Sequence, residues 1–284
     1  MQQSDLPSFL SIARQYRAVF FDSYGVLKDA GGVVEGGPDT LATLHAEGLE
    51  LRVLTNDASR SQGQQLERFH ELGYQTLRAS QIITSGMMAR MFLREKVTRG
   101  TVAYMGTSNA ASYVLGAGCL AVPVGDVSED DVIDALVFLD DEGFDYNTDL
   151  NAAINLLRRV NVPVVVANSD KLYPVHGGRV ALATGGIAQL IESIVGREFM
   201  QFGKPDTQMF NYAFEDLNRD DSFAKRDVLM VGDTLHTDIL GGNKFGIKTC
   251  LTLSGNTSLK GHRSDIRRSG IIPDHVVMGI GSQV

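Results

Sequence analysis

RAVFFDSYGVLKD, residues 17–29, is the stretch that decides the fold of this chain. Its apolar run, residues 18–21, is typical of a strand buried in a parallel sheet, because such strands are nearly continuous in hydrophobic residues. The run ends at Asp22, and ligands of open α/β sheets bind just beyond the carboxyl ends of the strands. A carboxylate there is costly to desolvate unless it is paired or binds a metal. Asp22 is therefore a candidate nucleophile, since an Asp side chain can form a covalent intermediate.

Strand-like and helix-like segments alternate along most of the 284 residues. This alternation predicts an α/β fold with a doubly wound, mainly parallel, Rossmann-like sheet. Further apolar strands are predicted at residues 49–56 and 227–233, and helices at residues 38–48, 61–72 and 80–96.

A second run of alternating elements begins near residue 97 and continues almost to residue 198. We therefore predict a core domain made of residues 1–85 and 199–284, with residues 86–198 inserted as a separate α/β domain. The alternative is one continuous sheet that contains both parts.

The composition excludes several classes of function. The net charge of −8 offers no basic face, so no nucleic acid is expected as a partner. No membrane span is expected either, because no apolar stretch reaches the roughly 18–20 residues that a membrane helix needs. The polar N-terminus lacks the pattern of a signal peptide, and Cys119 and Cys250, without a CxxC partner, indicate reduced thiols. These features predict a cytoplasmic protein.

Polar residues follow the ends of two further predicted strands. Asp233 ends one apolar strand and Asp238 comes shortly after it. Mg²⁺ favours one or two carboxylates together with water and phosphate oxygens, so this pair is a candidate cation site. The alternative is that Asp233 only caps the next helix. Thr55 and Asn56 end another strand and offer a hydroxyl and an amide to a phosphoryl oxygen, although Thr is also common in strands.

Lys204 is the candidate phosphate-binding cation. It precedes Pro205 at a predicted helix start, where a positive charge and backbone N–H groups suit an anion. Most lysines are merely solvated, so Gly-Lys-Pro is a weak signal by itself. Together these signals are stronger than any one of them alone. The nucleophile comes first along the chain, followed by the hydroxyl, the lysine and the acidic pair.

The order, spacing and flanking residues of these segments resemble the haloacid dehalogenase superfamily of hydrolases. More narrowly, they resemble its class IIA phosphatases, the group that contains p-nitrophenyl, pyridoxal and sugar-operon phosphatases. The resemblance covers nearly the whole chain and is most specific at residues 54–61, 202–210 and 230–255. It implies that the insertion is a type-two cap, in which residues 167–170, ANSD, resemble the N-P-D element of that class.

The resemblance also implies roles for the motif residues. Asp22 would attack phosphorus and become an aspartyl phosphate, while Thr55 and Lys204 would hold the transferring phosphoryl group. Asp22, the main-chain carbonyl of Tyr24 and Asp233 would bind Mg²⁺. The implied substrate is a small phosphorylated metabolite. Because relatives often dimerise through the cap, the resemblance also implies a homodimer.

Further residues are expected to support this set. Asp238 would support the metal through water or through Lys204. Substrate contacts are expected from residues near the strand ends, namely Tyr24, Asn56, Arg60, Asn168, Asp170 and His176. The alternatives are that His176 is a plain surface residue and that Arg60 caps a helix. The paired Asp140 and Asp141 are expected to be solvated loop carboxylates.

The chain departs from its relatives at Tyr24, where phosphatases of this superfamily usually have a second Asp. That Asp protonates the leaving group and activates water, and such general acid–base catalysis contributes roughly 10²–10⁴-fold in rate. A phenol, with an ordinary pKa of about 10, donates a hydrogen bond but is a poor base for water. The metal contact at this position uses the backbone and should survive.

Three interpretations follow from this departure. The favoured one is a Mg²⁺-dependent phosphohydrolase whose chemistry tolerates the change. Either it acts best on good leaving groups, such as acyl or aryl phosphates, or another side chain, for example from the cap, replaces the acid. The second is a catalytically weak phosphate- or metabolite-binding protein. The third is a 2-haloacid dehalogenase, because Asp-x-Tyr-Gly resembles the first motif of that group; such an enzyme needs no metal, and Asp233 without a cation would repel a carboxylate substrate.

Overall fold

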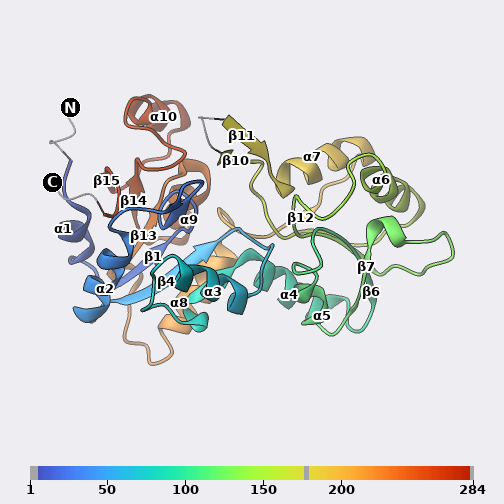
Figure 1. Cartoon of the computed structure of the whole chain (residues 1–284), viewed down its shortest axis with the longest axis horizontal. Helices are drawn as coiled ribbons and strands as arrows, with labels where there is room; N and C mark the ends of the chain where they lie inside the picture. Colours follow the sequence, from blue (N-terminus) through green and yellow to red (C-terminus); the bar gives the residue numbers. More distant parts are fainter. Residues whose placement is uncertain (1–5, 176–178, 282–284) are drawn as a thin grey trace. The chain divides into compact units, whose positions relative to one another are not determined.

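The structure is a computed structural model that describes residues 6–175 and 179–281, and these residues form two compact units. Unit 1 contains residues 6–55, 62–83 and 204–281, and unit 2 contains Asn56–Ser61 and Thr84–Gly203. Each unit has its own mainly parallel sheet with helices around it (Figure 1). The predicted α/β fold is confirmed.

Unit 1 is built on a six-stranded sheet in the order β15-β14-β13-β1-β4-β5. Its strands are β1 (Ala18–Phe21), β4 (Glu50–Thr55), β5 (Ile82–Thr84), β13 (Val228–Gly232), β14 (Lys248–Thr252) and β15 (His275–Val277). β1 lies between β13 and β4 and pairs in parallel with both (Figure 1). The strand order therefore reverses at β1: β4, the next strand of this sheet along the chain, lies on one side of β1, and β13, which follows unit 2, lies on the other. The carboxyl ends of β1 and β13 form the switch point at which ligands bind in such sheets.

The core of unit 1 explains why β1 is a strand. All four of its residues are buried, and Val19 and Phe21 pack in one apolar cluster with residues of the first two helices. Figure 1 labels the helices of this unit as α1 (Phe9–Ala13), α2 (Gly37–Ala46), α3 (Gln62–Glu71), α8 (Thr207–Leu217), α9 (Leu240–Phe245) and α10 (His262–Ser269). A short hairpin, β2 (Lys28–Asp29) and β3 (Gly32–Val33), follows the first loop.

One predicted helix begins later than expected. The segment predicted as a helix from residue 80 contains β5, and helix α4 spans Ser85–Lys96. The β-branched residues Ile82 and Ile83 are fully buried and extend the sheet edge, which outweighs their helical spacing. Thr84 then caps the helix, because its Oγ1 accepts a hydrogen bond from the Met87 N–H at 3.2 Å.

Unit 2 is built on a five-stranded sheet in the order β12-β9-β8-β6-β7. Its strands are β6 (Thr101–Met105), β7 (Leu120–Pro123), β8 (Ala135–Phe138), β9 (Val164–Val166) and β12 (Met200–Gln201), beside a separate hairpin of β10 (Leu172–Val175) and β11 (Arg179–Leu182). Helices α4, α5 (Ser112–Leu115), α6 (Asp149–Arg159) and α7 (Thr184–Val195) complete it. The five strands pair in parallel, so their carboxyl ends share one edge.

None of the helices in residues 6–175 and 179–281 is long and apolar enough to cross a lipid bilayer. Cys119 and Cys250 are both buried and unbonded to sulfur, as expected from their isolation in the sequence.

Candidate active site

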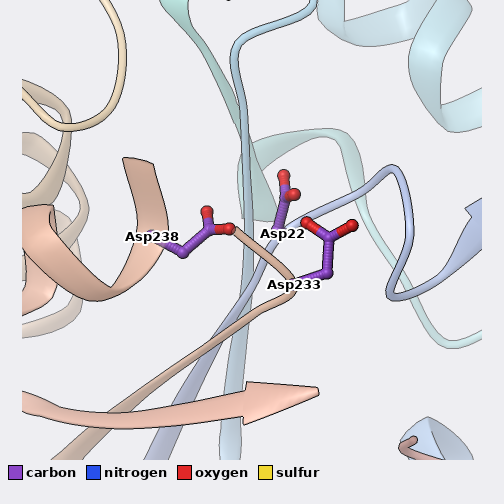
Figure 2. Close-up of side chains that lie close together, drawn as sticks. All are labelled: Asp22, Asp233 and Asp238. Atoms are coloured by element: carbon purple, nitrogen blue, oxygen red, sulfur yellow. The ribbon is translucent and has the colours of Figure 1, made fainter. Parts of the chain in front are cut away.

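Three carboxylates meet at the switch point of unit 1. Asp22 directly follows β1, and Asp233 directly follows β13. Asp238 comes from the π-helical turn Leu235–Ile239 that follows. Each offers one carboxylate oxygen to a group whose members all lie within 4.8 Å of one another, and Figure 2 shows the three side chains turned toward one space. Asp22 lies far from Asp233 and Asp238 in the sequence, and the parallel pairing of β1 with β13 brings it beside them.

Lys204 binds two of these carboxylates. Its Nζ lies 2.5 Å from Oδ1 of Asp22 and 2.8 Å from Oδ1 of Asp238. The Lys204 side chain is 2% exposed, so both ion pairs are shielded from water on the lysine side. A buried charge is tolerable only when it is paired, and Lys204 meets that condition twice.

The carboxylates are not fully neutralised by this lysine. Burial raises the pKa of Asp22 to about 6, with a further rise from Asp238 and an opposing effect of Lys204. Burial, Asp22 and Asp238 together raise the pKa of Asp233 to about 8. Burial alone would lower the pKa of Lys204, but Asp22 and Asp238 outweigh it and raise that pKa above its ordinary value. The site therefore has an excess of negative charge that favours a cation.

Glycine residues in the surrounding backbone leave room for the carboxylates. A Cβ atom on Gly232 would collide with the Asp238 carboxylate. Gly25 has φ +85° and Gly255 lies beside it, and a Cβ on either residue would collide with Asp233. Only glycine leaves room for so close an approach, and at Gly25 it also meets the left-handed backbone.

Two other predicted residues of unit 1 lie near these strand ends. Tyr24 is half-buried and lies two residues beyond Asp22. Its backbone pairs with that of Lys28 in an isolated β-bridge. Burial raises its pKa, and Asp29 and Asp233 raise it further, so the phenol stays protonated at neutral pH. Thr55 is 4% exposed at the end of β4, the strand that pairs with β1 on the other side.

Four of the predicted substrate contacts belong to unit 2. The Asn56 side-chain amide donates to Oδ1 of Asp170 at 3.0 Å, and the Asp170 N–H donates to Oδ1 of Asn168 at 3.0 Å. Arg60 is exposed, and its main-chain carbonyl accepts a hydrogen bond from the Tyr113 hydroxyl at 2.6 Å. His176 lies outside the described residues. Asn56 thus links the start of unit 2 to the loop that follows β9.

The prediction that Asp140 is a solvated loop carboxylate is wrong. Asp140 is 8% exposed at the end of β8 and accepts a hydrogen bond from the Thr107 hydroxyl at 3.0 Å. Burial raises its pKa to about 6, with smaller contributions from Asp141 and Asp57. The acidic pattern of the sequence suggested solvent, but the residue lies where the parallel strands of unit 2 end.

Replacing Asp140 by Asn is expected to stabilise the protein more at neutral than at acidic pH. Its raised pKa means that ionisation disfavours the folded state above about pH 4, and that this cost is complete near pH 7. The free energy of unfolding of Asp140→Asn relative to the wild type should therefore rise by on the order of 2 kcal/mol from about pH 4 to about pH 7. Urea denaturation at both pH values measures this change. Asp130→Asn, at an exposed site, should show no such trend, and an equal trend in both variants would contradict the prediction.

Comparison with known proteins agrees with this geometry. Residues 19–119 match the family described as haloacid dehalogenase-like hydrolase, and residues 201–281 match a second description, HAD-hydrolase-like. Chronophin from Mus musculus is 32% identical over 251 residues, which cover 87% of this chain and 84% of chronophin. The chain belongs to the haloacid dehalogenase-like hydrolases.

Other relatives narrow the group. Glycerol-3-phosphate phosphatase from Gallus gallus is 31% identical over 92% of this chain and 89% of its own length. The crystal structure of a possible sugar phosphatase from Cytophaga hutchinsonii has 44% identity and a TM-score of 0.94, with 99% of each chain covered. NagD from Escherichia coli has 26% identity and a TM-score of 0.75 over 95% of this chain and 99% of NagD. The predicted membership of the class IIA phosphatase group of this superfamily is confirmed.

Proposed function

We propose that this chain is a Mg²⁺-dependent phosphatase that hydrolyses a small phosphate ester through an aspartyl phosphate on Asp22. The observation that carries the proposal is the set of three buried or half-buried carboxylates within 4.8 Å, of which two share Lys204. A nucleophile, a cation-binding pair and a lysine are the parts that phosphoryl transfer needs, because catalysis of that reaction consists mostly of positioning and charge neutralisation.

The residues present fit a bound Mg²⁺ ion. Carboxylate oxygens are hard ligands of the kind that Mg²⁺ prefers. Burial and the neighbouring carboxylates raise the pKa values of Asp22 and Asp233, and a bound cation would favour their ionised forms. Asp22, Asp233 and the carbonyl of Tyr24 would hold the ion, with Asp238 in support through Lys204. When bound, Mg²⁺ supplies positive charge against the phosphoryl oxygens. A glycerol phosphate phosphatase from Mycobacterium tuberculosis, 25% identical with a TM-score of 0.75, has been solved in complex with magnesium.

The proposed reaction has two displacements at phosphorus. In the first, a carboxylate oxygen of Asp22 forms a bond to phosphorus, and the bond from phosphorus to the ester oxygen breaks. That oxygen leaves with the electron pair and takes up a proton from solvent. In the second, water attacks phosphorus and loses a proton to solvent, the bond from phosphorus to the Asp22 oxygen breaks, and inorganic phosphate leaves while the Asp22 carboxylate is regenerated. Lys204 and Thr55 would hold the phosphoryl group through both steps.

Tyr24 sets the proposed preference among substrates. Its raised pKa lets the phenol donate a hydrogen bond to a leaving oxygen, but leaves it unable to accept a proton from water. Acyl and aryl phosphates need least help in departure, so we propose them as the best substrates. The same residue supports the second candidate function, a catalytically weak protein that binds phosphate or a phosphorylated metabolite.

Unit 2 is the proposed cap of this enzyme. We propose that residues 86–198 are the inserted type-two cap and that residues 1–85 and 199–284 are the core. The separate five-stranded sheet of unit 2 supports an inserted domain, and its strand β12, Met200–Gln201, extends that sheet beyond residue 198. Caps of this kind favour small substrates, because closure excludes water. Asn56, Arg60, Asn168 and Asp170 remain proposed substrate contacts, and a homodimer remains the proposed assembly.

Phosphate release should depend on a divalent cation. We expect turnover of acetyl phosphate and p-nitrophenyl phosphate in the presence of Mg²⁺, and its loss when a chelator is added, because three carboxylates would otherwise repel an anionic substrate. A colorimetric phosphate assay over a panel of small esters measures this. Excess Mg²⁺ added after the chelator should restore the rate, which controls for damage by the chelator.

The outcomes of this assay separate the candidate functions. No turnover of any ester, with the protein folded and Mg²⁺ bound, would contradict the phosphatase and favour the binding protein. Halide release from chloroacetate, without phosphate release or metal dependence, would instead indicate a dehalogenase.

A further inference from the structure

Residues 254–257, the segment that follows β14, form hydrogen bonds that fix the position of Asp233. The Asn256 N–H donates to Oδ2 of Asp233 at 2.6 Å, and the Thr257 N–H donates to the Asp233 main-chain carbonyl at 3.1 Å. The other carboxylate oxygen, Oδ1, accepts a hydrogen bond from the Thr234 hydroxyl at 2.8 Å. Both oxygens of Asp233 are therefore fixed by neighbours.

The Asn256 side chain controls the direction of one of these bonds. Its Nδ2 lies 2.9 Å from Oγ1 of Thr234. An amide nitrogen can only donate, so the Thr234 oxygen accepts this bond, and its single proton is free to point at Asp233. Asn256 thereby orients the hydroxyl that orients the carboxylate.

The same segment also holds the loop that follows Asp22. The Ser254 hydroxyl donates to the main-chain carbonyl of Gly25 at 2.8 Å. A Cβ on Gly25 would lie 3.2 Å from the Cα of Gly255, so the two backbones are in contact beside the Asp233 carboxylate. Gly25 is bonded to Tyr24, whose carbonyl is a proposed metal ligand. One segment thus holds two of the three proposed ligands.

We infer that Asn256 is a positioning residue of the metal site, which sets cation affinity through Thr234 and Asp233 without touching the ion. This inference rests on the proposed Mg²⁺ site. Asn256 is exposed, so its side chain contributes little to the core. Residues that orient a metal ligand in this way typically change metal affinity by about 10- to 100-fold when they are replaced.

The test is calorimetric titration of the substrate-free protein with Mg²⁺. Asn256→Ala keeps the main-chain N–H that reaches Asp233 and removes only the amide, so we expect Mg²⁺ binding to weaken about tenfold. Ser258→Ala, an exposed site two residues beyond, is the matched control and should bind as the wild type does. Wild-type affinity in Asn256→Ala overturns the inference.

A double-mutant cycle separates positioning from general damage to the loop. Thr234→Ala should weaken Mg²⁺ binding as Asn256→Ala does, and the double variant should be no weaker than Thr234→Ala, because the amide then has no hydroxyl to orient. Thr234→Ser, which keeps the hydroxyl, should restore binding. Effects that simply add in the double variant overturn the inference.

Kinetics give a second readout. The Mg²⁺ concentration needed for half-maximal rate should rise in Asn256→Ala in step with the calorimetric change, while kcat at saturating Mg²⁺ stays within about twofold of the wild type. Failure of the proposed function is recognised separately: a wild type that binds no Mg²⁺, or whose binding survives Asp233→Asn, overturns the metal site itself and the inference with it.

Discussion

Replacing Asp22 by Asn is expected to lower turnover of every substrate by roughly 10⁴-fold or more, the scale seen when a covalent nucleophile is removed. An amide has no charged oxygen to attack phosphorus, so no aspartyl phosphate can form. The substitution also removes one of the two carboxylates that pair with Lys204. Initial rates with acetyl phosphate at saturating Mg²⁺, compared at equal protein concentration, measure the loss.

The control for Asp22→Asn is the same chemical change at Asp130, which is exposed in unit 2. Asp130→Asn should keep the wild-type rate. The covalent intermediate can also be measured directly. When turnover of acetyl phosphate labelled at phosphorus is stopped with acid, the wild-type protein should carry the label and Asp22→Asn should carry none. Label that persists in Asp22→Asn would mean that another residue is the nucleophile.

The ends of β1 and β13 could be predicted from the sequence, because the local pattern of apolar residues and the burial of these strands in the sheet agree. The residues of β1 and β13 are apolar throughout and buried throughout, as parallel pairing on both sides demands. A polar residue directly after such a strand therefore lies at the carboxyl edge of the sheet, where ligands bind. Asp22 and Asp233 were therefore visible as candidates in the sequence.

The partners of these residues could not be predicted from spacing. Lys204 lies 182 residues from Asp22 along the chain, and no local pattern states that its Nζ reaches both Asp22 and Asp238. Only the family resemblance suggested a common site. The role of Asn256 beside Asp233 carried no signal in the sequence, because it consists of a backbone N–H and of a side-chain amide that acts through the Thr234 hydroxyl.

Errors arose where tertiary packing opposes a local pattern. Ile82 and Ile83 have helical spacing with the residues that follow, yet both are buried in β5. Asp140 stands in an acidic stretch that reads as solvated, yet it is buried at the end of β8 with Thr107 as its donor. The first error lies in the edge strand of its sheet and the second just beyond the end of a central strand, and in both places the neighbour that decides burial comes from a distant part of the chain.

Tyr24→Asp is expected to raise turnover of alkyl phosphates by roughly 10²-fold or more, which is the lower part of the range for general acid–base catalysis. An Asp can protonate a poor leaving group in the first displacement and take a proton from water in the second. The phenol only donates a hydrogen bond in the first displacement and cannot act as the base in the second, because burial, Asp29 and Asp233 keep its pKa above the ordinary value. Rates with glycerol phosphate at saturating Mg²⁺ measure the gain.

The dependence on leaving group makes this prediction specific. Acetate needs little protonation to leave acetyl phosphate. Tyr24→Asp should therefore raise the rate with acetyl phosphate less than the rate with an alkyl ester, so the differences in rate among the esters of the panel should become smaller. Tyr24→Phe is the matched control: it removes the hydroxyl, keeps the ring and leaves the backbone carbonyl in place, so it should lower alkyl ester turnover and leave metal binding intact. A Tyr24→Asp variant with bound Mg²⁺ and an unchanged rate on every ester would mean that acid–base assistance comes from another group, and that Tyr24 does not set the substrate preference.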